Sequence, residues 1–255
     1  MITIKSKREI ELMREASKIV AHMYEYLETV IRPGMSAYEL DKLAEEFMRK
    51  NGGTPAQINY PSGVKGVAPF PASTCVSVND MIIHGIPSKD VIFKDGDIVK
   101  VDTVIEKNGY NGDAARTFLI GEVDPEVKRL ADVTKQAFFE GLKYAKAGNR
   151  VGDISYAIQE YVWSQGFDVI REFQGHGIGK EMHEDPGVPN YGKPGKGPRL
   201  EPGMTICIEP MVTQFEPDIF EDEDGWGIFT QDGGMTAHYE NTILITDGEP
   251  EILTI

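Results

Sequence analysis

The chain has 255 residues, of which 26 are Lys or Arg and 41 are Asp or Glu, so its formal net charge is −15. Hydrophobic residues at 40% and charged residues at 26% are typical of a folded globular protein and exclude a disordered or fibrous one. The acidic balance argues against DNA binding, because a nucleic-acid footprint needs clustered Lys and Arg. There is no apolar run long enough for a membrane span, no apolar signal core at the start, and no disulfide framework among two cysteines. A cytoplasmic protein with no membrane partner is expected.

Four amphipathic helices are predicted. Ser6 with Glu9 three residues later is a capping-box pattern, and apolar residues then follow helical spacing. Asp124-Pro125 supplies an N-cap and a proline at the first helical position. The four predicted helices begin at Ser6, Ser36, Asp124 and Gly152-Asp153.

The two halves of the chain share one pattern. Eighteen positions separate one pair of turn glycines in the first half, and the same number separates a pair in the second: Gly34 and Gly52, Gly148 and Gly166. The segments 96–102 and 203–209 are also alike, because each is a β-type run with an acid six positions after a glycine. This internal similarity predicts a single domain over residues 1–255, built from duplicated halves at about 6–120 and 124–246.

Short β-branched runs between glycine turns predict the strands. They are expected at 73–78, 97–105, 109–120, 167–173, 204–213 and 236–246. Because tight turns join neighbouring strands, the sheet should be mainly antiparallel. The predicted fold class is therefore α/β (α+β), a curved sheet backed by four helices.

Asp102 and Asp113 lie on two strands joined by a turn that contains Asn108-Gly109, a strong hairpin signal. A turn centred near Lys107–Asn108 places the two aspartates directly opposite each other. Like charges in such a pair are destabilising, so something must neutralise them. Either one carboxyl is protonated or pairs with Arg116, or a cation lies between them.

Two further acids favour the cation. Glu209 and Glu240 each interrupt a strand-like segment, and a buried carboxylate is costly unless it is paired or coordinated. Four acids and a histidine suit two divalent cations, and mixed oxygen and nitrogen ligands favour Mn, Fe, Co or Zn.

Three histidines stand in contexts typical of accessible imidazoles. His84 and His176 each precede a glycine, and His183 precedes Glu184-Asp185. Each of them alone could be a structural histidine.

Six strings together identify a family. They are Val99–Asp102, Gly109–Phe118, Gly175–Gly179, His183–Pro186, Gly203–Met211 and Tyr239–Thr242. In order and spacing they resemble type I methionine aminopeptidases over nearly the whole chain. The resemblance implies the pita-bread fold and an enzyme that removes the initiator methionine from nascent polypeptides when the second residue is small and uncharged.

The resemblance also implies site residues. Asp102, Asp113 and Glu240 would hold one metal, and Asp113, His176, Glu209 and Glu240 the other, so that two divalent ions (Co, Mn, Fe, Ni or Zn) are bound per chain. Glu209 would be the proton acceptor, His183 would contact the substrate carbonyl oxygen, and His84 the nitrogen of the scissile bond. Phe70, Cys75, Met182 and Trp226 are the candidates for the methionine pocket, although Phe70 and Trp226 could equally be core residues. Cys75 is expected to be a pocket wall and not a nucleophile.

The chain departs from the family pattern at three places: Met182 replaces an aromatic residue, His238 replaces a glutamine, and the stretch 60–70 differs. A prolidase or Xaa-Pro aminopeptidase is the alternative enzyme, but those relatives carry a sizeable extra N-terminal domain. A non-catalytic binding protein would have no reason to retain all the ligands and site histidines.

The segment 216–225 carries six acids and no Lys or Arg, and is expected to be a long loop at the rim of the active site. It could also be a solvated loop that contacts nothing. A transient ribosome contact is expected to avoid this segment, because rRNA would repel it, and to use Lys193, Lys196 and Arg199 instead. A monomer is expected.

Overall fold

The computed structural model describes residues 1–255 and contains the four predicted helices. They are α1 (Lys7–Val30), α2 (Ala37–Lys50), α3 (Pro125–Leu142) and α4 (Val151–Ser164). The capping box at Ser6 and Glu9 is confirmed, because each side chain bonds the backbone N–H of the other. The Asp124 side chain accepts from the N–H of Glu126, with proline in the first turn. Local capping chemistry therefore sets where these helices begin.

Fifteen short strands complete the fold. They are β1 (Thr54–Pro55), β2 (Cys75–Val78), β3 (Met81–Ile83), β4 (Ile98–Lys107), β5 (Tyr110–Leu119), β6 (Asp168–Val169), β7 (Gln174–Gly177), β8 (Glu184–Pro189), β9 (Thr205–Ile208), β10 (Met211–Thr213), β11 (Ile219–Glu221), β12 (Ile228–Thr230), β13 (Thr236–His238), β14 (Glu240–Leu244) and β15 (Glu251–Ile252). The large sheet has the order β1-β4-β5-β14-β9-β7-β8, with β2 on β4 and β15 on β14. Every pairing in this sheet is antiparallel, as predicted.

Two predicted strands are each broken in the middle. The run 204–213 divides into β9 and β10 around Glu209-Pro210, and the run 236–246 divides into β13 and β14 at Tyr239. On either side of the break the strands pair in different sheets, β9 with β14 and β10 with β13. Pro210 has no N–H to continue a ladder, so the chain turns out of the large sheet at this point.

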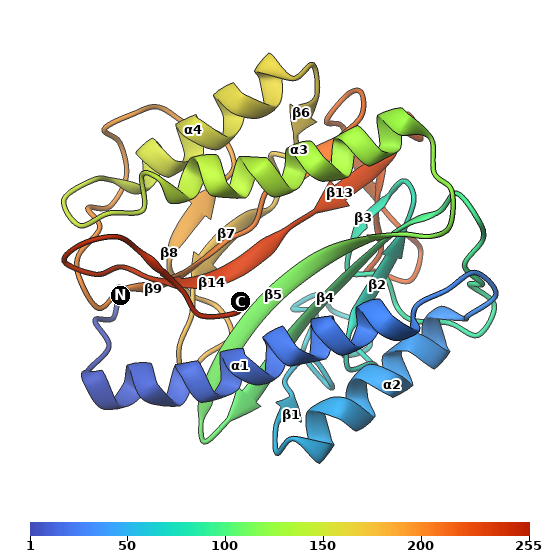
Figure 1. Ribbon diagram of the computed structural model, residues 1–255, viewed down its shortest axis with the longest axis horizontal. Helices are drawn as coiled ribbons and strands as arrows, with labels where there is room; N and C mark the ends of the chain where they lie inside the picture. The colour runs from blue at the N-terminus through green and yellow to red at the C-terminus, as the bar shows by residue number, and fades with distance from the viewer.

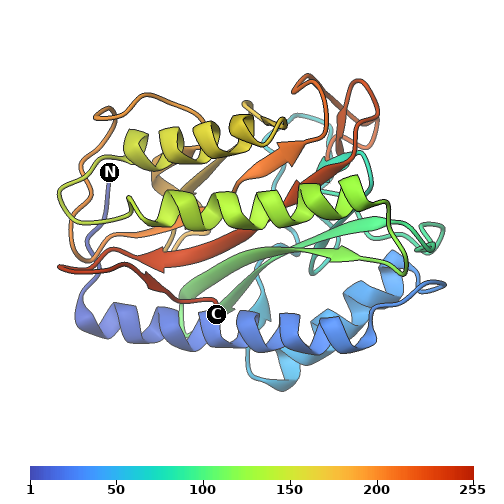
Figure 2. The same ribbon diagram turned by 45° about the horizontal axis from the view of Figure 1, so that its top comes forward.

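The helices cover one face of the sheet in two pairs (Figure 1). Helix α1 packs on β4 and β5, while α3 packs on β9, β10 and β13 and α4 on β6 and β8. Figure 2 shows the same two pairs of helices along the curved sheet. Each pair has its own apolar core against the strands beneath it. The opposite face of the sheet is left without a helix.

Candidate active site

A cleft of about 890 Å³ contains all eleven residues that the sequence predicted for the site, and no helix contributes to its lining. Those residues are Phe70, Cys75, His84, Asp102, Asp113, His176, Met182, His183, Glu209, Trp226 and Glu240. They come from segments far apart in the chain, brought together by β2, β4, β5, β7, β14 and the loops between strands. The cleft therefore joins contributions from both halves.

The predicted register of the aspartate hairpin was wrong. Asp102 pairs with Ala115, and Asp113 pairs with Val104. The reason is the turn, which is centred on Asn108 and Gly109 with positive φ at both residues, 55° and 80°. Asp102 and Asp113 are consequently diagonal neighbours on the same face of the sheet, where long-range repulsion between their carboxylates persists.

Arg116 does not neutralise this pair. Its guanidinium donates to backbone carbonyl oxygens of Glu240 (2.5 Å) and Thr254 (3.1 Å) and to the Asn241 side chain (2.7 Å). It forms no ion pair with Asp102 or Asp113, so this alternative is wrong.

The surroundings of the four acids in the cleft disfavour their ionised forms. Burial raises the pKa of Asp102 to about 7. Burial, and then the charges of the neighbouring acids, raises the pKa of Asp113, Glu209 and Glu240 well above ordinary values. Asp113 Oδ1 and Glu240 Oε1 are buried without a hydrogen-bond partner. Buried oxygens without donors, in a cluster of carboxylates, are what a divalent cation would satisfy.

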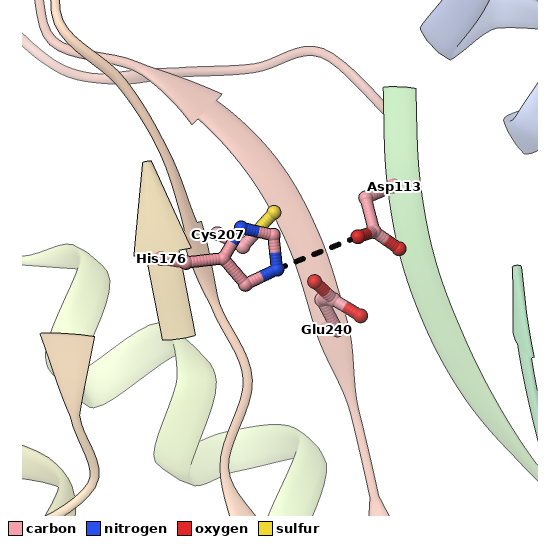
Figure 3. A group of neighbouring side chains, drawn as sticks. All are labelled: Asp113, His176, Cys207 and Glu240. Carbon is pink, nitrogen blue, oxygen red and sulfur yellow. Dashed lines mark ion pairs between the residues drawn. The ribbon is translucent and has the colours of Figure 1, made fainter. Parts of the chain in front are cut away.

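His176 completes this group. Its Nε2 lies 3.6 Å from Asp113 Oδ2 and 3.6 Å from Glu209 Oε1, and Figure 3 shows the ring directed at Asp113. Its Nδ1 lies 2.9 Å from the carbonyl oxygen of Gly177. Burial, followed by the nearby His183, lowers the pKa of His176 to about 4, so the ring is neutral. Since a carbonyl can only accept, Nδ1 carries the proton and Nε2 presents a lone pair, as in a metal ligand.

Four side chains from four strands could together hold a metal ion: Asp113, His176, Cys207 and Glu240, whose ligand atoms lie within 4.8 Å of one another (Figure 3). Sequence reasoning did not include Cys207. Burial, and then the charges of nearby acids, raises the pKa of its thiol well above the usual value, so it is not a thiolate. Asp102 and Glu209 line the cleft but lie outside this group of four.

Hydrogen bonds across the sheet fix the acid-bearing strands. Asp113 and Thr242 exchange two bonds, since the Asp113 N–H donates to Thr242 Oγ1 (3.0 Å) and that hydroxyl donates to the Asp113 carbonyl (2.9 Å). Asn190 donates to the carbonyl of Glu209 (3.0 Å) at the break between β9 and β10. The carboxylates are thus carried by backbone that cannot shift independently.

The two remaining site histidines also line the cleft. His84 has φ of 60° and packs edge-on against Phe173 and Trp226, with ring centroids 5.6 and 6.3 Å apart. Burial, followed by His183, lowers the pKa of His84 to about 4. The His183 ring is 4.4 Å from that of His176, and burial lowers its pKa as well.

An apolar pocket adjoins the acids. Phe70 and Cys75 are almost fully buried, and Phe70 meets Trp226 edge-on at 5.1 Å. The Trp226 indole donates to the carbonyl of Ala68 (3.0 Å), which holds the ring over the pocket. Burial, and then nearby carboxylates, raises the pKa of the Cys75 thiol, so the thiol keeps its proton. Phe70 and Trp226 therefore face the cleft as well as packing on each other.

Sequence reasoning missed two contributors to the cleft. Tyr60 bonds His183 through its hydroxyl, and Phe173 packs on His84. Tyr60 falls in the stretch 60–70, whose departure from the family pattern was the signal. His238, by contrast, is buried with both ring nitrogens unpartnered, 3.9 Å from Glu209 Oε2, and does not line the cleft.

The acidic segment 216–225 is partly a hairpin, because β11 pairs with β12. The expectation of a continuous loop is therefore corrected, since Phe220 stacks on Phe229 across this pair at 5.4 Å. Glu221 and Gly225 line the cleft, so the segment does lie at its rim.

Comparisons with known proteins agree on one family. Residues 11–247 match metallopeptidase family M24. The chain is 51% identical over 255 residues to a methionine aminopeptidase of Clostridium acetobutylicum, covering 100% of this chain and 99% of that one. The crystal structure of a methionine aminopeptidase from Thermotoga maritima superposes with a TM-score of 0.95 at 45% identity, covering 100% and 99% of the two chains. This confirms the pita-bread α/β fold.

A more distant structure bears on the alternative enzyme. An Xaa-Pro dipeptidase from Bacillus anthracis has a TM-score of 0.78 and 26% identity, and the match covers 98% of this chain but 61% of that one. Among the four helices, none has an apolar stretch that could span a lipid bilayer.

Proposed function

The chain belongs to metallopeptidase family M24 and is a methionine aminopeptidase by its similarity, and we propose that the cleft described above is where it hydrolyses the peptide bond after an N-terminal methionine. The observation that carries the proposal is the convergence of four acids, three histidines and an apolar pocket in one cleft. Hydrolysis needs a proton acceptor, a group that stabilises negative charge on oxygen, and a site for the substrate side chain. The cleft offers a candidate for each.

Divalent metal ions are the cofactors of such metallopeptidases, and the unpartnered oxygens of Asp113 and Glu240 fit them. We propose two ions, one held by Asp102, Asp113 and Glu240 and the other by Asp113, His176, Glu209 and Glu240. Oxygen and neutral imidazole donors suit Co, Mn, Fe, Ni or Zn. When bound, the ions supply Lewis acidity that activates water and polarises the scissile carbonyl.

The protein's own groups move the proton and stabilise charge. Glu209, which lines the cleft 3.6 Å from His176 Nε2, would accept the proton of the attacking water and deliver it to the leaving amine. His183 would donate a hydrogen bond to the carbonyl oxygen as charge develops there, a contribution of about 10²–10³ in rate for similar donors. His84 would contact the nitrogen of the scissile bond.

The apolar pocket would bind the methionine side chain. Phe70, Cys75, Met182 and Trp226 offer aromatic and sulfur surfaces, and a thioether makes favourable contacts with aromatic rings. We propose that cleavage requires a small, uncharged second residue (Gly, Ala, Ser, Thr, Cys, Pro or Val).

A peptide assay tests this function against the proline-directed alternative. Purified enzyme with Mn(II) or Co(II) is incubated with Met-Ala-Ser, Ala-Ala-Ser and Ala-Pro-Ser, and products are followed by mass spectrometry. Loss of methionine from the first peptide alone is expected. Preferential cleavage of Ala-Pro-Ser would favour a prolidase-like enzyme.

We also propose that residues 1–255 form one catalytic domain of two repeated halves, 6–120 and 124–246. Support comes from glycines at equivalent turns, which share left-handed backbone conformations. The pairs are Gly34 and Gly148 (φ 84° and 94°), Gly52 and Gly166 (76° and 79°), and Gly96 and Gly203 (93° and 91°). Glycine adopts this conformation with the least strain, so the equal backbone geometry of the three pairs, in the same order in both halves, supports duplication.

The proposed setting is the cytoplasm, with nascent polypeptides as substrates, no DNA or membrane partner, and a monomeric enzyme. A transient ribosome contact would use Lys193, Lys196 and Arg199, because the acidic segment 216–225 is repelled by rRNA. Co-sedimentation with ribosomes at two salt concentrations tests this. Neutralising the basic cluster should weaken binding, and neutralising the acidic segment should strengthen it or leave it unchanged. Loss of binding in the second variant would contradict the proposal.

A further inference from the structure

The hydroxyl of Tyr60 lies 2.6 Å from Nδ1 of His183. The two rings meet edge-on with centroids 5.4 Å apart, and both residues line the cleft. Nothing in the reaction outlined above uses Tyr60. A phenol this close to one nitrogen of a site histidine must affect what the other nitrogen can do.

The loop that carries Tyr60 is held by its own backbone. The Tyr60 N–H donates to the carbonyl of Gln57 (3.0 Å), and its carbonyl accepts from the N–H of Phe70 (2.9 Å). Asn59, with φ of 65°, donates to the carbonyl of Phe70 (2.8 Å). The Tyr60 ring also packs on the cluster of Phe70 and Cys75 beside the methionine pocket. Its hydroxyl is therefore fixed in place beside His183.

The neighbouring side chains of His176 and His183 have hydrogen-bond partners of different kinds at Nδ1. His176 faces the carbonyl of Gly177, which can only accept, so its proton lies on Nδ1 and its Nε2 carries a free lone pair. His183 faces a hydroxyl, which can donate. Burial, and then the charge of Glu181, raises the pKa of Tyr60, so the phenol keeps its proton. If the phenol donates to Nδ1 of a neutral imidazole, the ring proton must lie on Nε2.

We propose that Tyr60 is a positioning residue that holds His183 with its proton on Nε2, ready to donate to the substrate carbonyl oxygen. The proposal rests on the role given to His183 under the proposed function. With the proton on Nδ1 instead, Nε2 would be an acceptor and would repel the developing negative charge. The two partners at Nδ1 thus give neighbouring rings, 4.4 Å apart, different tasks.

The first test is the Tyr60→Phe variant, which removes the hydroxyl and keeps the ring. Tyr144→Phe, at an exposed tyrosine, is the matched control. Because one neutral hydrogen bond is lost, kcat on Met-Ala-Ser should fall about two- to twelvefold with KM nearly unchanged. In a His183→Ala background the same substitution should have no further effect. An equal loss in that background would overturn the proposal, because Tyr60 would then act independently of His183.

The second test reads the tautomer directly and does not depend on activity. In wild-type protein labelled with ¹⁵N-histidine, the His183 signals, assigned by their absence in His183→Ala, should show a protonated Nε2 and an unprotonated Nδ1. Tyr60→Phe should shift them toward a mixture of tautomers. A wild-type His183 with its proton on Nδ1 would refute the proposal, whether or not the variant folds. If this tautomer is found while Met-Ala-Ser is not cleaved, the proposed function is wrong and the positioning contact stands.

Discussion

Lys5 and Glu184 form a buried ion pair that ties the start of the chain to the strand after His183. Lys5 Nζ lies 2.6 Å from Glu184 Oε2, and the two side chains are only 5% and 12% exposed. The same carboxylate accepts a hydrogen bond from Thr3 Oγ1 (2.7 Å). The lysine stem packs tightly on Gly179, where an added Cβ would come 2.6 Å from Lys5 Cε. We expect the Lys5→Met variant to keep the packing of the apolar part of the side chain while leaving the Glu184 carboxylate without its ion-pair partner.

The magnitude follows from the burial. Removing one partner of a buried pair leaves an uncompensated charge and costs about 3–5 kcal/mol, a large share of the about 5–15 kcal/mol that stabilises a typical domain. In the double variant Lys5→Met/Glu184→Gln no charge is left, so most of the loss should be recovered. The matched control is Lys128→Met. Lys128 forms an ion pair with Asp132 at the surface, where the two side chains are 61% and 65% exposed. Such a surface pair contributes about 0–1 kcal/mol.

Urea denaturation followed by circular dichroism measures these differences, and pH gives a second signature. Burial raises the pKa of Glu184, but hydrogen bonds from Lys5 and Thr3 outweigh it, so the net shift is downward. A carboxyl whose pKa is lowered in the fold stabilises the folded state at pH values above its ordinary pKa of 4.5. This stabilisation is lost as the pH falls through the pKa that the carboxyl has in the folded protein. The gap between wild type and Lys5→Met should therefore be full at pH 7 and narrow in acid. The reasoning is refuted if Lys5→Met costs no more than Lys128→Met at pH 7.

Three further outcomes are expected. Chelation should abolish activity, and returning Mn(II) or Co(II) should restore it and raise the melting temperature, with about 2.7 kcal/mol of stabilisation at a hundred times Kd; full turnover after verified metal removal would contradict the metal assignment. Glu209→Gln should keep the fold by circular dichroism but lose about 10²–10⁴ in kcat, so a rate within about threefold of wild type would exclude Glu209 as the base. Burial lowers the pKa of Lys100 from 10.5 to about 7. Between pH 7 and 10 this lysine is therefore neutral in the folded protein but still charged in the unfolded chain, so the free energy of unfolding of the wild type should rise with pH over this range. Lys100→Met should lack this rise in urea denaturation, and parallel pH profiles would show that Lys100 is not responsible.

The helices could be predicted from sequence because their ends depend on neighbours within a few residues. Ser6 and Glu9 cap α1 through contacts three positions apart, and Asp124 caps α3 in the same local way. Glu209 and Glu240 could also be singled out as residues of the cleft, because a carboxylate within an apolar run is costly wherever the strand is placed. These signals require no knowledge of the tertiary structure.

The predictions were wrong or incomplete where the structure depends on the exact position of a turn or on a contact with a residue far away in the sequence. The two-residue turn at Asn108–Gly109, displaced by one residue from the assumed centre, moved Asp102 from opposite Asp113 to a diagonal position. The breaks at Glu209-Pro210 and Tyr239 depend on which sheet each strand joins, and sequence patterns do not contain that information. Tyr60 was missed because its partner His183 lies 123 positions away.

The broken strands have a consequence for the site. Glu209 lies in the break between β9 and β10, outside the ladder, whereas Glu240 is the first residue of β14, directly after the break that follows β13. Both line the cleft together with Asp113. Asp102 and Asp113 come from the first half of the chain, whereas His176, Glu209 and Glu240 come from the second. The two halves meet along β5 and β14, where Glu240 pairs with Ala115. Repulsion among the four carboxylates opposes this junction, and the proposed cations, held by acids from both halves, would reverse the sign of that contribution. Metal binding should therefore stabilise the junction between the halves more than either half alone, and amide hydrogen exchange should slow most in β5 and β14 when metal is added.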